Sequence, residues 1–189
     1  MRSLLAIAAL LISSQVAAGP TEYTLDSAET VVTFEVRRLG ISSQAGEFSR
    51  VAGTVTLDAE AGNGAIDIAV DTRSIRAGSE TMENFLRGPG VLNVEQHTEI
   101  AYKAAHVVFA NGKPDKIDGH LTLLGVTRAV SLKVVSYTCT DREARERRCR
   151  LDATATFKRS DFGMNRYLAL VSDEVKLAIH GVADDTTSR

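Results

Sequence analysis

Apolar and polar residues alternate along most of the chain after residue 30, which is the pattern of half-buried β-strands. Val32, Phe34 and Val36, for example, alternate with polar residues. Eight such runs occur, centred on residues 32–36, 51–57, 66–70, 100–108, 117–123, 130–134, 151–157 and 175–179. The pattern predicts an all-β domain, and this number of strands fits either a closed up-and-down barrel or a sandwich.

The segments between the runs are short and rich in turn-forming residues. AGNG at residues 61–64 and NGKPD at residues 111–115 are turn sequences between alternating runs. Connections of this length favour antiparallel hairpins over helical crossovers. Small residues at inward positions, namely Gly53, Gly119, Ala153 and Ala155, either leave room for a channel or let neighbouring side chains meet.

One segment, residues 79–87, has the spacing of a helix instead. Met82, Phe85 and Leu86 lie three and four positions apart, which places them on one helical face. Ser79 is suited to cap the first turn, and Gly88-Pro89-Gly90 ends the helix. We therefore predict a short helix inserted between strands, acting either as a plug at one barrel end or as a lid over a cavity.

The first 18 residues have the features of a cleavable signal peptide. Arg2 precedes an apolar run from Leu4 to Ile12, and Val16-Ala17-Ala18 provides small residues for a signal peptidase. A run of about nine residues is too short for a spanning helix, which needs about 20. We expect cleavage after Ala18, a periplasmic or secreted protein, and one domain over residues 19–189.

Charge and cysteine content narrow the possible partners. The formal net charge is −2 and the chain has no Trp, so it lacks the basic stripe and stacking platform of a nucleic-acid-binding protein. Export places Cys139 and Cys149 in an oxidising compartment, and we predict that they form a disulfide. The nine residues between them, TDREARERR, are expected to form a solvated hairpin tip.

The search for catalytic and metal-binding motifs favours a protein without either kind of site. The four histidines are scattered without metal-ligand spacing, and no nucleophile elbow, P-loop or dinucleotide fingerprint occurs. Asp161 and Asp173 are expected to cap turns or to pair with Arg159. Arg87 is expected to be either a solvated cap of the helix or a charge that faces a lipid headgroup.

Several strings resemble the signature segments of the YceI-like family. These are GHLTLLGVTRAV (119–130), FKRSDFGMN (157–165) and VSDEVKL (171–177), together with the opening segment 23–55 and the middle segment 79–102. The resemblance spans nearly the whole mature chain, in the family's order. It implies an eight-stranded, antiparallel, lipocalin-like barrel with an elongated apolar cavity that binds polyisoprenoid or other long-chain lipids.

The chain departs from the family where polar side chains could meet a headgroup. Family members often carry His at the positions of Glu29, Arg38 and Phe85, Asp at that of Glu83, and Pro at those of Thr98 and Ala129. The resemblance therefore predicts the fold and an apolar ligand, but not the headgroup.

We predict a non-enzymatic lipid carrier without a cofactor, whose ligand is a polyisoprenoid, an isoprenoid quinone or a fatty amide. Transient membrane contact and a homodimer are compatible with this function. The alternatives are an enzyme acting on an isoprenoid or quinone, and a stress-related barrel filled by its own side chains. The predicted polar residues at the mouth are Arg87, Arg159 and Asp161. The predicted lining residues are Phe34, Phe48, Phe85, Leu86, Leu92, Tyr102, Leu121, Leu123, Phe162 and Met164.

Overall fold

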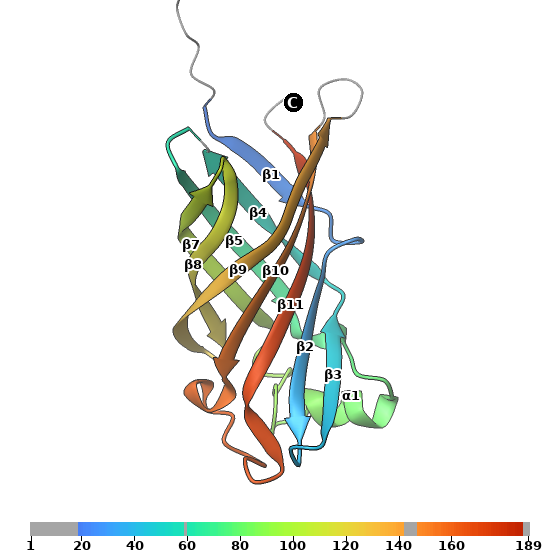
Figure 1. Cartoon of the computed structure of the whole chain (residues 1–189). Helices are drawn as coiled ribbons and strands as arrows, with labels where there is room; N and C mark the ends of the chain where they lie inside the picture. The colour runs from blue at the N-terminus through green and yellow to red at the C-terminus, as the bar shows by residue number, and fades with distance from the viewer. Residues whose placement is uncertain (1–18, 59, 142–146, 187–189) are drawn as a thin grey trace, which may run out of the picture.

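The alternating runs form long antiparallel strands that wind around one interior (Figure 1). This computed structural model describes residues 19–58, 60–141 and 147–186, so the predicted signal peptide lies outside the described residues. The strands are β1 (Thr21–Leu25), β2 (Val31–Arg38), β3 (Ser42–Phe48), β4 (Val51–Asp58), β5 (Asn63–Asp71), β6 (Ile75–Arg76), β7 (Glu99–Ala110), β8 (Lys113–Leu123), β9 (Val126–Asp141), β10 (Arg147–Lys158) and β11 (Val171–Asp185). The helices are α1 (Glu80–Arg87) and the 3₁₀ turns η1 (Thr72–Ser74) and η3 (Arg159–Phe162).

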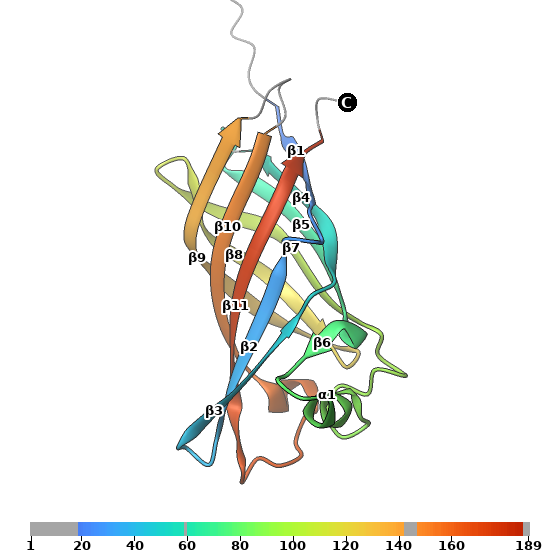
Figure 2. The ribbon, with the colours of Figure 1, turned by 90° about the vertical axis from the view of Figure 1, so that its right-hand side faces the viewer.

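Eight of these strands close into a ring, which confirms the predicted barrel. The hydrogen-bonded order is β1-β4-β5-β7-β8-β9-β10-β11, and β1 also pairs with β11. Strand β2 pairs with the other part of β11 and continues into β3 and β6. The ring therefore includes β1, which the alternation did not reveal, while β2 belongs to an extension of the sheet at one end (Figure 2).

We call the end that carries α1, the β2–β3 turn and residues 163–170 the mouth end, which is the lower end in Figure 1. The opposite end, where β1 begins and β11 finishes, is the far end. Among the described residues, no helix is long and apolar enough to cross a membrane.

Helix α1 forms where the spacing predicted it. The Ser79 hydroxyl accepts a hydrogen bond from the Met82 amide at 3.3 Å, and Gly88 ends the helix. Arg87 fastens the helix to β6, because its guanidinium donates to the Ile75 carbonyl at 2.9 Å and contacts the Glu83 carboxylate at 3.0 Å. Both terminal nitrogens of Arg87 donate within the protein, to Asn84, Ile75 and Glu83, so the guanidinium is neither a freely solvated cap nor free to face a headgroup.

A disulfide joins β9 to β10 near the far end, as predicted. Cys139 and Cys149 are directly opposite each other in the antiparallel register and are bonded. We expect that changing both cysteines to serine lowers the free energy of unfolding by roughly 2–3 kcal/mol, because the link restricts the unfolded chain. Urea unfolding of the variant and of the oxidised protein measures this difference, and equal stabilities would contradict the expectation.

Arg148 corrects the expectation that the residues between the cysteines are all solvated. Its side chain is only 6% exposed and contacts the carboxylates of Asp26 and Glu29, each at 2.6 Å, and of Asp184 at 3.0 Å. The three acids come from elements distant in sequence, so the string TDREARERR alone did not indicate them. This cluster ties β10 to β11 and to the segment after β1.

The Arg148 cluster predicts a defined acid sensitivity. The hydrogen bond from Arg148 lowers the pKa of Asp26 below its usual value, so the contribution of Asp26 to stability is present above its unfolded pKa. That contribution is lost as the pH falls through the lower, folded pKa, which means below roughly pH 4. We expect Arg148→Met to lower the thermal midpoint at neutral pH and to flatten its decline in acid.

The matched control for this prediction is Arg150→Met. Arg150 is 47% exposed and has a longer contact, 3.7 Å, with Glu29. Its replacement is expected to change the thermal midpoint little. An acid profile of Arg148→Met identical to that of the unmodified protein would rule out the proposed contribution of the cluster.

Candidate functional site

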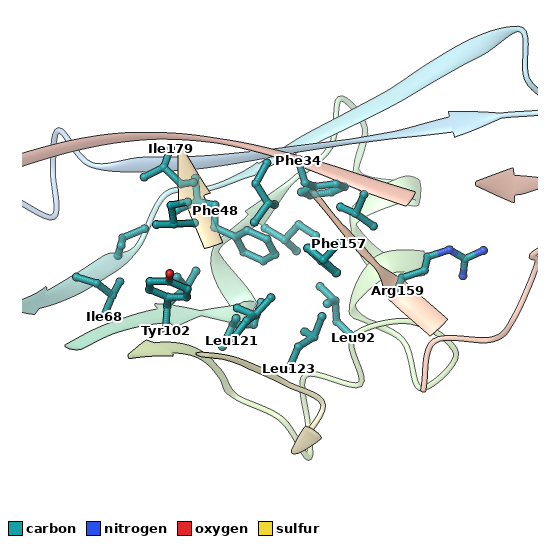
Figure 3. A pocket seen from close by; sticks show the side chains of 18 of the residues that line it. Phe34, Phe48, Ile68, Leu92, Tyr102, Leu121, Leu123, Phe157, Arg159 and Ile179 are labelled. Atoms are coloured by element: carbon teal, nitrogen blue, oxygen red, sulfur yellow. The ribbon is translucent and has the colours of Figure 1, made fainter. Parts of the chain in front are cut away.

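A cavity of about 690 Å³ occupies the interior of the barrel (Figure 3). Its wall extends from Tyr23 and Ala183 at the far end to Arg38 and Arg166 at the mouth end. Nearly all of the side chains between these limits are aliphatic or aromatic. In Figure 3, Phe34, Ile179 and Leu121 reach the same space from different strands, with Arg159 toward one end.

The strand alternation produces this wall directly. On β11, Val175, Leu177, Ile179 and Gly181 line the cavity, while Lys176 between them is exposed on the outside. Several inward side chains, such as Leu177 and Ile179, are only partly buried. Because they face the interior, their exposed surface faces the cavity rather than the outer wall. The barrel is therefore not filled by its own side chains.

Tyr102 shows how a polar group is accommodated in this wall. Its hydroxyl is within hydrogen-bonding distance of the Val130 carbonyl, at 2.9 Å, and of the Ile117 carbonyl, at 3.3 Å. Its ring lies against Gly119, where a Cβ atom would be 2.5 Å from the ring. Burial raises the pKa of the Tyr102 hydroxyl, so this part of the wall stays neutral.

Of the two alternatives for the small inward residues, a channel or close packing, the structure shows close packing. The space over Gly119 is taken by the Tyr102 ring, and a Cβ at Gly53 would lie 2.1 Å from the Asp67 carbonyl oxygen. Ala153 and Ala155 are buried and are not part of the cavity wall. Of the glycines in the barrel strands, Gly181 is the one that lines the cavity.

Most of the predicted site residues lie on the cavity wall. They come from the strands, from α1 and from the segments that follow α1 and η3. They are Phe34, Phe48, Phe85, Leu86, Leu92, Tyr102, Leu121, Leu123, Arg159 and Met164. Their contact with a ligand stays a prediction.

Three predicted residues do not line the cavity. Arg87 is held by Glu83 and the Ile75 carbonyl, as described above. Asp161 is exposed on the outside of η3. Phe162 is 1% exposed and packs edge-on against Phe157, with ring centroids 5.2 Å apart. Phe162 is thus a core residue behind the wall, and Phe157 is the residue that faces the cavity.

Arg159 organises the segment at the mouth. Its Nη1 donates to the carbonyls of Met164 at 2.9 Å and Arg166 at 2.7 Å, and its Nη2 donates to that of Val171 at 3.0 Å. Its Nε donates to the Ser172 carbonyl at 2.9 Å. The guanidinium therefore shapes residues 163–172. It does not pair with Asp161, which corrects the pairing that the sequence had suggested.

Asp173 has the turn-capping role expected for it. Its carboxylate accepts hydrogen bonds from the Ser160 amide at 2.9 Å and the Ser160 hydroxyl at 2.7 Å. These bonds lower the pKa of Asp173, so it is a fixed carboxylate at neutral pH.

Polar wall residues cluster at the mouth, and the sequence reasoning missed several of them. Arg38, Gln44, Ser79, Thr81 and Arg166 line this part of the cavity. The sequence had indicated Arg38 only as a departure from the family pattern. Arg166 stands among apolar neighbours in NRYLAL, and that combination could have identified it. Across the described ranges, no three His, Cys, Asp or Glu side chains form a group that could hold a metal ion.

Comparison with solved structures shows the same fold elsewhere. The protein BcnA of Burkholderia cenocepacia has a TM-score of 0.71 and 22% identity, over 84% of this chain and 98% of its own. A polyisoprenoid-binding domain from Saccharophagus degradans, implicated in plant cell wall breakdown, has a TM-score of 0.65 and 14% identity, over 86% and 98% of the two chains.

Sequence comparison identifies the family. A UPF0312 protein of Pseudomonas aeruginosa is 28% identical over 172 residues, which is 90% of either chain. Another UPF0312 protein, from Pectobacterium carotovorum, is 27% identical over 183 residues and 95% of either chain. The YceI-like domain matches residues 23–183, which include every strand of the barrel except the ends of β1 and β11. The chain therefore belongs to the YceI-like family.

Proposed function

We propose that this protein binds a long-chain apolar lipid, of the polyisoprenoid type, inside its barrel and carries or sequesters it outside the cytoplasm. The observation that carries the proposal is the unfilled cavity of about 690 Å³ with an almost wholly apolar wall. This volume lies within the range of about 300–1,000 Å³ that is typical of ligand sites.

The wall suits a chain without polar groups along its length. Its deeper part has few hydrogen-bonding side chains, and the Tyr102 hydroxyl already has main-chain acceptors. Each buried methylene contributes about 0.8 kcal/mol, so ten of them contribute about 8 kcal/mol before the costs of association. The polar residues at the mouth, such as Arg38 and Gln44, would then meet a headgroup.

The structural neighbour from Saccharophagus degradans, which is named as a polyisoprenoid-binding domain, supports this ligand class. The signal-peptide features of residues 1–18 support export, and N-terminal sequencing of the exported protein tests it. A chain that begins at Gly19 is the expected result. An intact Met1 on protein recovered from the cytosol would contradict export.

Native mass spectrometry of the purified protein tests the ligand. We expect an adduct that is released on unfolding, and extraction should identify it as a long apolar chain. Protein that carries no lipid and takes up no added polyprenol would overturn the proposal. Chemical conversion of the added polyprenol would point to the enzyme instead.

A further inference from the structure

Exposed apolar side chains are concentrated at the mouth of the barrel. We call Leu39 and Ile41 of the β2–β3 turn, Phe85 of α1, and Tyr167, Leu168 and Leu170 of the segment before β11 the mouth collar. Of the large apolar side chains that are exposed in the described part of the chain, only Val135 lies outside the collar. Such a concentration on one end of a protein marks an interaction surface.

The three elements of the mouth collar are joined to one another. The Leu39 amide donates to the Leu170 carbonyl at 2.8 Å, which connects the β2–β3 turn with the segment before β11. The rings of Phe85 and Tyr167 are in contact, with centroids 5.7 Å apart, which connects that segment with α1. The three segments of the collar are therefore connected at the mouth end of the barrel, where Figures 1 and 2 show them together.

The backbone of the collar is strained at two of its apolar positions. Leu39 has φ 51° and Tyr167 has φ 63°, in the left-handed region that side chains rarely occupy. Both side chains are also exposed to solvent, Leu39 by 59% and Tyr167 by 47%. The φ of Leu39 belongs to the β2–β3 turn, in which the Ile41 amide donates to the Arg38 carbonyl at 3.2 Å, whereas the exposure of the two apolar side chains does not stabilise the fold and fits contact with a partner.

The charge around the collar identifies the partner. Residues 36–46 and 162–172 contain Arg37, Arg38 and Arg166 and no acidic residue, in a chain whose net charge is −2. The acidic residues at the edges of these ranges are Glu35, Glu47, Asp161 and Asp173, of which Glu35 accepts a hydrogen bond from Ser43 and Asp173 from Ser160. On α1, Glu83 is paired with Arg87, and Glu80 remains as an acidic residue. Exposed Leu, Ile, Phe and Tyr side chains beside arginines match an anionic bilayer, which accepts apolar groups and attracts cations.

We propose that the mouth collar docks on the surface of an anionic phospholipid bilayer, with the opening of the barrel against the lipid. Leu39, Ile41 and Leu168 enter the interfacial region, and Arg37 and Arg166 lie at the level of the phosphates. A lipid chain then passes between the bilayer and the cavity without crossing water. The transfer step rests on the proposed function, whereas the docking does not.

Vesicle co-sedimentation of the mature protein, residues 19–189, tests the docking. The probes are vesicles of phosphatidylcholine alone and of phosphatidylcholine with phosphatidylglycerol. We expect binding to the phosphatidylglycerol vesicles that weakens as salt is added, because the contact is partly electrostatic. Arg37→Gln with Arg166→Gln should weaken it roughly tenfold or more, since each arginine near the surface contributes separately.

Matched control variants separate the collar from general effects. Ile41→Ser with Leu168→Ser should lose vesicle binding, while Val135→Ser, which removes a side chain 66% exposed on β9, should keep it. Lys113→Gln with Lys133→Gln changes the net charge by the same amount on exposed residues away from the collar. Thermal unfolding by circular dichroism verifies that each variant is folded.

Some outcomes would overturn the docking. These are an unmodified protein that binds neither kind of vesicle, collar variants that bind as well as their controls, and a collar-dependent dimer in analytical ultracentrifugation in place of vesicle binding. Uptake of polyprenol from detergent, without vesicles, distinguishes the two proposals. The variant with Ile41→Ser and Leu168→Ser should retain this uptake, because neither residue lines the cavity. Collar-dependent vesicle binding without any uptake would leave the docking intact and refute the proposed function.

Discussion

Phenylalanine in place of Gly181 is expected to displace the long-chain lipid while leaving the thermal midpoint unchanged or slightly higher. Gly181 lines the cavity from β11, and a Cβ there would meet only the Leu151 carbonyl oxygen, at an ordinary 3.7 Å. The backbone therefore tolerates a side chain. The phenylalanine ring would occupy cavity space toward the far end. It would bury apolar surface of the cavity wall that is now uncovered. Native mass spectrometry and circular dichroism measure the two effects.

Ala153→Phe is the matched control, with the opposite expectation. Ala153 is on the inward side of β10 but is 1% exposed and is not on the cavity wall, so its surroundings are already filled. A ring there should destabilise the protein by about 1–3 kcal/mol, and the folded protein should keep its lipid. If Gly181→Phe instead lost stability and kept the same lipid, the ligand would have to be bound outside the cavity.

The alternation predicted the barrel because it records which side chains face inward. It missed β3, since Ser42–Phe48 is mostly polar and much of it lies in an extension with solvent on the outside. It also missed β1 and β6, which are too short for a pattern of period two to be recognised. Ring membership depends on pairing between distant strands, such as β1 with β4 and β11, and no local pattern encodes that pairing.

Within the site, the alternation of apolar and polar residues shows which side chains face inward. It does not show which of these line the cavity and which are packed in the core. Leu177 and Ala155 are both inward and opposite each other in the register, yet only Leu177 lines the cavity. The difference depends on what stands across the barrel, which local sequence does not specify. Polar clusters were missed for the same reason, because the partners of Arg148 lie more than 100 residues away or on the final strand.

The difference between a residue that lines the cavity and one that is packed in the core also determines the expected result of replacing two phenylalanines. Phe162→Ala should lower the free energy of unfolding by about 3–5 kcal/mol, because Phe162 is fully buried and its removal leaves a void beside Phe157. The folded variant should bind the same lipid, since Phe162 is behind the wall.

Phe34→Ala is the comparison, because Phe34 faces the cavity and packs on one side against Phe48, with centroids 5.8 Å apart. Its ring also lies over Gly46, but the side chain is only partly buried and lines the cavity, so its removal should cost distinctly less stability than Phe162→Ala and should enlarge the cavity. Urea unfolding and native mass spectrometry of both variants measure the outcome. Equal losses of stability, with unchanged lipid in both, would mean that Phe34 is as fully packed as Phe162 and that the cavity does not extend to β2.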